Sequence, residues 1–123
     1  MFLHGGLLDR RMWGGQFAFF ARNHRAIRYD MRCSGESKTT PTTEPFTHHE
    51  DLRKFLWALE IDRVSLVRLY NYAVALDFTI AYPELVDKLV LVSPGLRAYD
   101  FRDPWGGTQF AAMMQALSRQ DLM

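Results

Sequence analysis

Short apolar runs alternate with segments of helical periodicity along this chain of 123 residues, and this alternation restricts its fold more than any other feature. The runs at 1–3, 25–29, 63–69 and 88–92 are typical of buried strands. Parallel strands need crossover connections of about a dozen residues or more, which helices commonly supply. The sequence therefore predicts an α/β fold, in which a short parallel sheet of about four strands carries helices on both faces.

The best-defined predicted helix follows Thr47. Thr47 and Glu50 have the spacing of a capping box, in which the two side chains satisfy free N–H groups at a helix start. Its apolar stripe comprises Leu52, Phe55, Leu56 and Leu59. We expect two further helices, one after the glycine pair 14–15 and one over 73–82 that ends before Pro83.

Composition excludes several classes of protein. A net charge of +1 gives no basic surface for nucleic acid or an anionic membrane, and no apolar run approaches the length of a membrane span. The single cysteine, Cys33, cannot form a disulfide within the chain, and no His/Cys cluster has zinc-site spacing. We therefore expect a cytoplasmic protein that binds neither metal nor cofactor.

Four stretches of the sequence carry a family pattern in its usual order and spacing. They are the run 3–6 (Leu-His-Gly-Gly) with Trp13, the loop 28–37, the helix approach 46–52 and the segment 82–95. On these stretches the chain resembles the α/β-hydrolase family, in the branch of enol-lactonases, small esterases and dehalogenases. The resemblance implies the central part of that fold over 1–98, followed over 99–123 by a helical segment similar to the start of a cap.

The resemblance also implies where ligands would bind. In the family, the loop that corresponds to His4, Gly5, Gly6 and Leu7 supplies backbone N–H groups to an oxyanion hole, so a small carbonyl compound is a candidate ligand. His4 is expected to orient this loop rather than to act as a base. Asp30, at the end of the second strand, is expected to brace the loop that follows it.

The sequence departs from the family at the turn that carries the nucleophile. The elbow remnant comprises Arg68, Tyr70, Asn71 and Tyr72. Arg68 and Tyr72 replace both glycines of the G-x-S-x-G pattern, Tyr70 stands at the nucleophile position, and 67–75 contains no Ser, Cys or Asp. Because bulky side chains do not fit a strained, tightly packed turn, we expect a relaxed, rebuilt one.

These departures lead to the predicted function. The family's acid and histidine follow later strands, and the sequence stops before the stretch that would supply the histidine. We therefore predict a hydrolase-like protein that lacks the Ser-His-Asp triad and is catalytically inactive as it stands. One alternative is a hydrolase of carbonyl esters or lactones with a nonstandard nucleophile, Tyr70 or Cys33. A ligand-binding or partner-binding module is another.

Two further expectations concern partners and reactive groups. In the family's order the four strands lie as second, first, third and fourth, so 25–29 and 88–92 form the outer edges. Exposed parallel edges favour a homodimer or a complementing chain. Cys33 lies beside Arg32, a cation that would lower a thiol pKa and make a reactive thiol, but we expect a passive loop cysteine. His48 and His49 are expected on the surface of a helix.

Overall fold

The computed structural model describes residues 1–37, 45–70 and 74–93. Their elements are β1 (Phe2–Leu3), the 3-10 helix η1 (Arg10–Trp13), α1 (Gly14–Phe20), β2 (Arg28–Tyr29), α2 (His48–Ala58), β3 (Val64–Leu69), α3 (Val74–Ala81), the 3-10 helix η2 (Pro83–Leu85) and β4 (Val86–Val92). The predicted alternation of strands and helices is confirmed over this part of the chain. The segment 99–123, predicted to be helical, lies outside the described residues.

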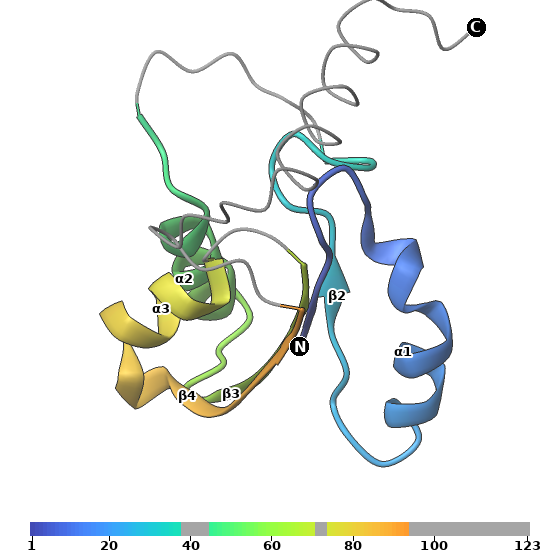
Figure 1. Cartoon of the computed structure of the whole chain (residues 1–123). Helices are drawn as coiled ribbons and strands as arrows, with labels where there is room; N and C mark the ends of the chain where they lie inside the picture. Colours follow the sequence, from blue (N-terminus) through green and yellow to red (C-terminus); the bar gives the residue numbers. More distant parts are fainter. Residues whose placement is uncertain (38–44, 71–73, 94–123) are drawn as a thin grey trace, which may run out of the picture.

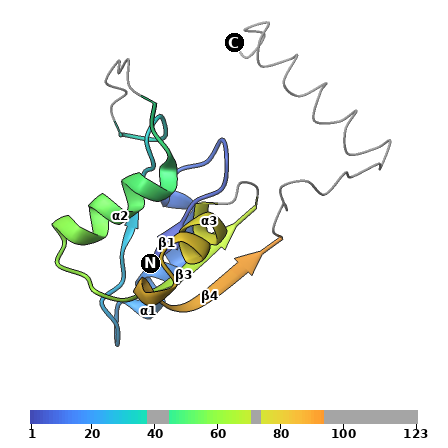
Figure 2. The same cartoon turned by 90° about the vertical axis from the view of Figure 1, so that its left-hand side faces the viewer.

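The four strands form one parallel sheet in the order β2-β1-β3-β4 (Figures 1 and 2), which confirms the predicted order. Leu3 of β1 pairs with Tyr29 on one side and with Arg68 on the other. β3 and β4 pair along their whole length, with Leu66 opposite Leu89. All strands therefore end at the same edge, and the segments that follow them start there.

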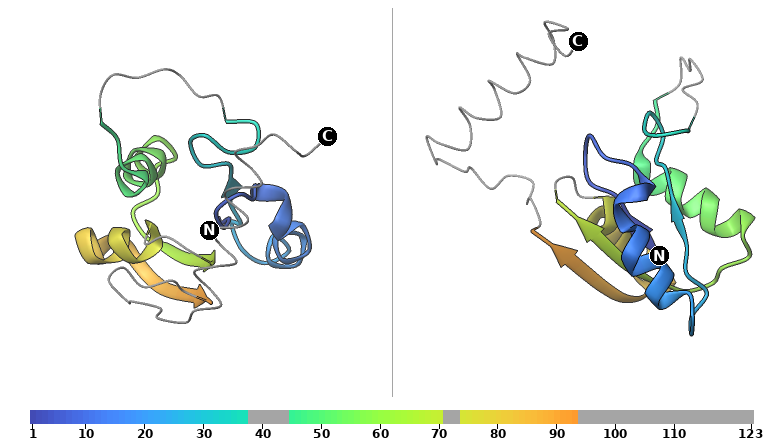
Figure 3. Two further views of the ribbon diagram at one scale, coloured as in Figure 1. Left: turned by 45° about the horizontal axis from the view of Figure 1, so that its top comes forward. Right: turned by 90° about the vertical axis from the view of Figure 1, so that its right-hand side faces the viewer.

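Helices cover both faces of the sheet, as predicted: α1 lies on one face, and α2 and α3 lie side by side on the other (Figures 1 and 3). Strand alternation decides which side chain meets which layer. Phe2 faces α1, and its ring centroid lies 5.4 Å from that of Trp13. Leu3 faces the opposite way and belongs to the core between the sheet and α2 and α3.

The main core lies under α2 and α3. Its fully buried side chains are Leu3, Leu52, Leu56, Leu66, Ala75 and Phe78. The predicted apolar stripe of α2 is thus confirmed on its buried face, since Leu52 and Leu56 are buried in this core. Phe55 is half-buried against Tyr29, and the two ring centroids lie 4.4 Å apart.

The capping box predicted at the start of α2 is wrong in its side-chain contacts. Thr47 occupies the N-cap position with extended backbone, but its side chain makes no capping hydrogen bond. Glu50 instead accepts a hydrogen bond from the hydroxyl of Tyr82, which follows α3. A contact between α2 and the residue that follows α3 has therefore replaced the local contact that the sequence pattern favoured.

Within the described residues, no helix combines the length and the apolar character that a membrane crossing requires.

Candidate functional site

The loops after the strands meet at the carboxyl edge of the sheet, which is the usual location of ligand sites in open α/β sheets. In the described part of each of these four loops, one residue other than glycine has a left-handed backbone. They are Leu7 (φ 62°), Cys33 (φ 66°), Tyr70 (φ 39°) and Ser93 (φ 51°). Side chains disfavour this conformation by about 1 to 2 kcal/mol per residue, so the surrounding structure holds these turns in place.

The loop after β1 packs against the turn after β3. A Cβ atom at Gly5 would lie 3.1 Å from the carbonyl oxygen of Leu69 and 3.5 Å from that of Tyr70. The loop itself turns back, since the N–H of Leu8 donates to the carbonyl of Gly5 at 3.3 Å. The segment expected to resemble an oxyanion loop and the elbow remnant are therefore in direct contact through Gly5, while Gly6 and Leu7 are exposed.

His4 is buried completely and bonds only to backbone groups in the contacts described here. Its Nδ1 lies 2.8 Å from the carbonyl oxygen of Gly5, and its Nε2 accepts a hydrogen bond from the N–H of Met31 at 3.0 Å. Both ring nitrogens are thus directed at the loops after β1 and β2. The geometry agrees with an orienting role for His4.

Asp30 organises the loop after β2. Its carboxylate accepts hydrogen bonds from the backbone N–H groups of Arg10 (2.7 Å) and Glu36 (2.9 Å), and it forms an ion pair with the guanidinium of Arg10. Burial alone would raise the pKa of this carboxyl, but these donors hold the pKa below its usual value. The bracing role expected for Asp30 is consistent with this network.

Arg68 and Tyr70 occupy the end of β3 and the turn that follows. Arg68 is buried, with 4% of its surface exposed, and its Nη1 lies 3.4 Å from the sulfur of Met31. Burial lowers the pKa of this guanidinium below its usual value. The side chain of Arg68 is thus buried near Met31 and does not extend into solvent.

The relaxed turn expected after β3 is wrong at Tyr70. Tyr70 has a φ of 39° and leaves 54% of its surface exposed. Its N–H donates to the carbonyl of Val92 at 2.9 Å, which continues the pairing of β3 and β4 past the end of β3. This pairing holds the strained backbone in place. Asn71 and Tyr72 lie outside the described residues.

Cys33 is exposed in the loop after β2. The neighbouring guanidinium of Arg32 donates two hydrogen bonds of 2.7 Å to the carboxylate of Asp51 and lies 4.4 Å from the ring centroid of Phe46. The positive charge expected beside the thiol is therefore largely compensated by Asp51. The loop is linked to the first turn of α2 by this ion pair.

Sequence reasoning missed that His48 is half-buried. The Nδ1 atom of His48 is buried without a hydrogen-bond partner among the described residues, and burial lowers the pKa of the imidazole. His48 begins α2, and Arg68, Arg32 and Asp51 are close enough to affect its charge. Sequence spacing could not show this, because it depends on groups that β3 and the loop after β2 bring near the start of α2. No group of three or more metal-ligating side chains occurs within residues 1–37, 45–70 and 74–93.

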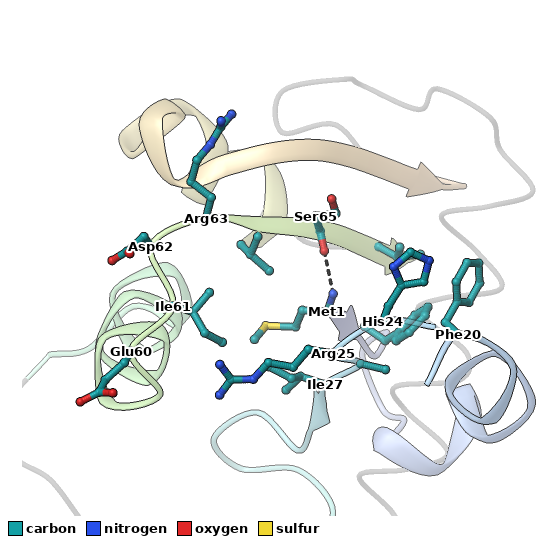
Figure 4. A pocket seen from close by; sticks show the side chains of 14 residues that line it. Met1, Phe20, His24, Arg25, Ile27, Glu60, Ile61, Asp62, Arg63 and Ser65 are labelled. Carbon is teal, nitrogen blue, oxygen red and sulfur yellow. Dashed lines mark hydrogen bonds between the residues drawn. The ribbon is translucent and has the colours of Figure 1, made fainter. Parts of the chain in front are cut away.

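The sequence also gave no sign of a cavity at the opposite, amino edge of the sheet. This open pocket of about 600 Å³ lies where Met1, Ile27, Ile61 and Val64 meet, with Arg25 at its side (Figure 4). The pocket is separate from the loops of the carboxyl edge. Because the predicted chemistry belongs to the carboxyl edge, the cavity is not the site that the sequence pattern identified.

Solved structures show what this arrangement resembles. A hydrolase from Pseudomonas aeruginosa matches with a TM-score of 0.69 and 28% sequence identity, over 94% of this chain and 44% of its own. A marine microorganism esterase matches with a TM-score of 0.75 at 21% identity, and the α/β hydrolase MGS-M2 from a Medee basin deep-sea metagenome with 0.65 at 24%. Both matches include 95% of this chain and 45% of the solved protein. The chain therefore has part of the α/β-hydrolase fold.

Sequence relatives are similar over a smaller share of their length. Uncharacterized proteins from Mycobacterium tuberculosis and Mycobacterium bovis are 31% identical over 97 residues, which is 77% of this chain and 28% of theirs. No protein-family model matches the chain. The chain thus spans less than a third of the curated relatives and less than half of the solved hydrolases that it matches.

Proposed function

We propose that this chain is an α/β-hydrolase-like protein without Ser-His-Asp chemistry, and that it does not hydrolyse esters as it stands. The observation that carries the proposal is the position of Tyr70. This residue directly follows β3 and lies against Gly5, where the fold would present a nucleophile, and it offers a phenol in place of an activated hydroxyl or thiol.

The surroundings of Tyr70 support the same proposal. An activated nucleophile needs a base within hydrogen-bond reach, about 2.6 to 3.2 Å. His4 lies in the loop that contacts this turn, but its two nitrogens already bond to Gly5 and Met31. His4 is therefore committed to holding the loops and is not available to take a proton from Tyr70.

The test is turnover of short-chain p-nitrophenyl esters by the purified chain, compared with Tyr70→Phe and Cys33→Ala. We expect all three proteins to show the same rate as the uncatalysed reaction, and mass spectrometry after incubation to show no acyl adduct. Turnover that disappears in either variant would overturn the proposal and identify the nucleophile.

One observation favours the second candidate, an ester or lactone hydrolase that uses Tyr70. The combination of a φ of 39° with 54% exposure is what a nucleophile turn requires, because it projects the side chain from the sheet edge. An acyl adduct located on Tyr70, absent from Tyr70→Phe, would establish this candidate.

Self-association stays a prediction. It is supported by the positions of β2 and β4 as outer strands of the described sheet, and by Val90 and Val92, which are 49% and 42% exposed on β4. Sedimentation across a concentration series tests it. A single species of 14.3 kDa at every concentration would contradict it.

A further inference from the structure

The cavity at the amino edge of the sheet has an apolar interior. Met1 and Ile61 line it from opposite sides, and their side chains point toward one another across it (Figure 4). Ile27 and Val64 complete this apolar lining. Met1 and Val64 belong to the main core, and Ile27 and Ile61 pack against it, so the lining is held in place. The volume of about 600 Å³ is typical of sites that bind small organic molecules.

Arg25 lines the side of this cavity and carries a charge without an ion-pair partner within residues 1–37, 45–70 and 74–93. Its Nη2 donates to the carbonyl of Leu59 at 3.2 Å, so the guanidinium is held at the C-terminal end of α2. Other arginines form ion pairs with carboxylates: Arg10, Arg11, Arg32, Arg53 and Arg63. Because a guanidinium has five N–H donors in a planar fork, most of the donors of Arg25 remain for a ligand.

The other charged groups of the lining are directed elsewhere. The side chains of Glu60 and Asp62 extend from the turn after α2 away from the cavity, and Arg63 extends toward the opposite side (Figure 4). The amino group of Met1 donates to the carbonyl of Ser65 at 2.6 Å. The charge that remains open to the cavity is therefore the positive charge of Arg25.

We infer that this cavity binds a small monocarboxylate with an apolar tail, of the class of medium-chain fatty acids. The carboxylate accepts two parallel hydrogen bonds from the guanidinium of Arg25, and the tail displaces water from Met1, Ile61 and Val64. One open guanidinium balances one negative charge, which favours a carboxylate over a phosphate with its charge near −2. The inference does not depend on the proposed function, because the cavity and Tyr70 lie at opposite edges of the sheet.

Calorimetric titration of the full chain with octanoate tests this site. We expect saturable binding of one octanoate with a Kd at or below about 1 mM. 1-Octanol has the same tail without the charge and should bind at least about tenfold more weakly. Arg25→Gln should weaken octanoate binding by about tenfold or more, because it removes the charge that pairs with the carboxylate. Arg22→Gln is the matched control, since Arg22 is exposed and does not line the cavity, and it should bind octanoate as the wild type does.

NMR of the wild-type chain locates the ligand without any variant. Octanoate should shift the methyl signals of Ile27, Ile61 and Val64. Absence of saturable octanoate binding would overturn the inference, and so would equal affinity of the wild type and Arg25→Gln. Binding of 1-octanol as tight as that of octanoate would exclude recognition of the carboxylate. Shifts confined to the loops of the carboxyl edge would also overturn it, because they would place the ligand beside Tyr70.

Discussion

Gly35 lies directly against the carboxylate of Asp30, so that a Cβ atom at this position would overlap both oxygens of the carboxylate. Gly35 also has a φ of 52°, in the left-handed region that favours glycine. Asp30 in turn bonds to the backbone of the next residue, Glu36, at 2.9 Å. The loop after β2 is thus built around a buried carboxylate that only glycine can approach this closely.

Gly35→Ala should lower the free energy of unfolding by at least about 2 kcal/mol, because it adds steric overlap with Asp30 to the strain of a left-handed alanine. Gly15→Ala is the matched control. It lies in α1 with nothing within 4 Å of its Cβ position, and it should be neutral or stabilising by up to about 1 kcal/mol. Urea denaturation measures both, and equal effects of the two variants would contradict the packing at Gly35.

Asp51 should make stability depend on acid pH. The hydrogen bonds from Arg32 hold the pKa of Asp51 below its ordinary value, so the folded state favours the charged carboxylate. The resulting stabilisation is complete above about pH 4 and is lost as the pH falls through the folded pKa. Asp51→Asn should cost about 1 kcal/mol near neutral pH and flatten the curve below about pH 4. Asp62→Asn, at an exposed position, should leave the curve unchanged.

Phe78→Ala should cost about 3 to 5 kcal/mol, because Phe78 is fully buried where α3 packs on the sheet and its removal leaves a cavity. Ile80→Ala, on the same helix but 72% exposed, should change the free energy of unfolding by less than about 1 kcal/mol. Thermal and urea unfolding of the two variants compare them directly. A similar loss in both would show that the helix is oriented differently on the core.

Tyr70→Gly should leave the free energy of unfolding unchanged or raise it by up to about 1 kcal/mol. Glycine removes the strain of a φ of 39°, and this gain offsets the greater freedom of the unfolded chain. The same substitution at Leu69, within β3, should be destabilising, since glycine weakens a strand interior. A clear loss of stability in Tyr70→Gly would indicate that the phenol itself holds the turn.

Local patterns in the sequence were sufficient for the architecture. The concentration of Val and Leu in 63–69 and 88–92 predicted β3 and β4, and the stripe through Leu52 and Leu56 predicted the buried face of α2. These features depend on the periodicity of apolar residues, which can be read directly from the sequence. The prediction that Tyr70 stands at the nucleophile position rests on the family pattern and not on periodicity.

Long-range contacts determined the candidate site. Thr47 and Glu50 matched a capping box, yet Glu50 bonds to Tyr82, far along the chain, because α2 and α3 pack side by side. The left-handed turn at Tyr70 likewise depends on pairing with Val92 of another strand. No local pattern encodes either contact.

The sequence by itself determined the α/β alternation and the absence of Ser, Cys and Asp from 67–75, and the order of the strands followed from the family resemblance. Only the tertiary structure decided that Arg68 is buried, that Tyr70 is strained and exposed, and that His4 joins two loops through its two ring nitrogens. The physical reason is that periodicity fixes which face of each element is apolar, whereas burial, strain and hydrogen bonding are fixed by partners that other segments bring into contact.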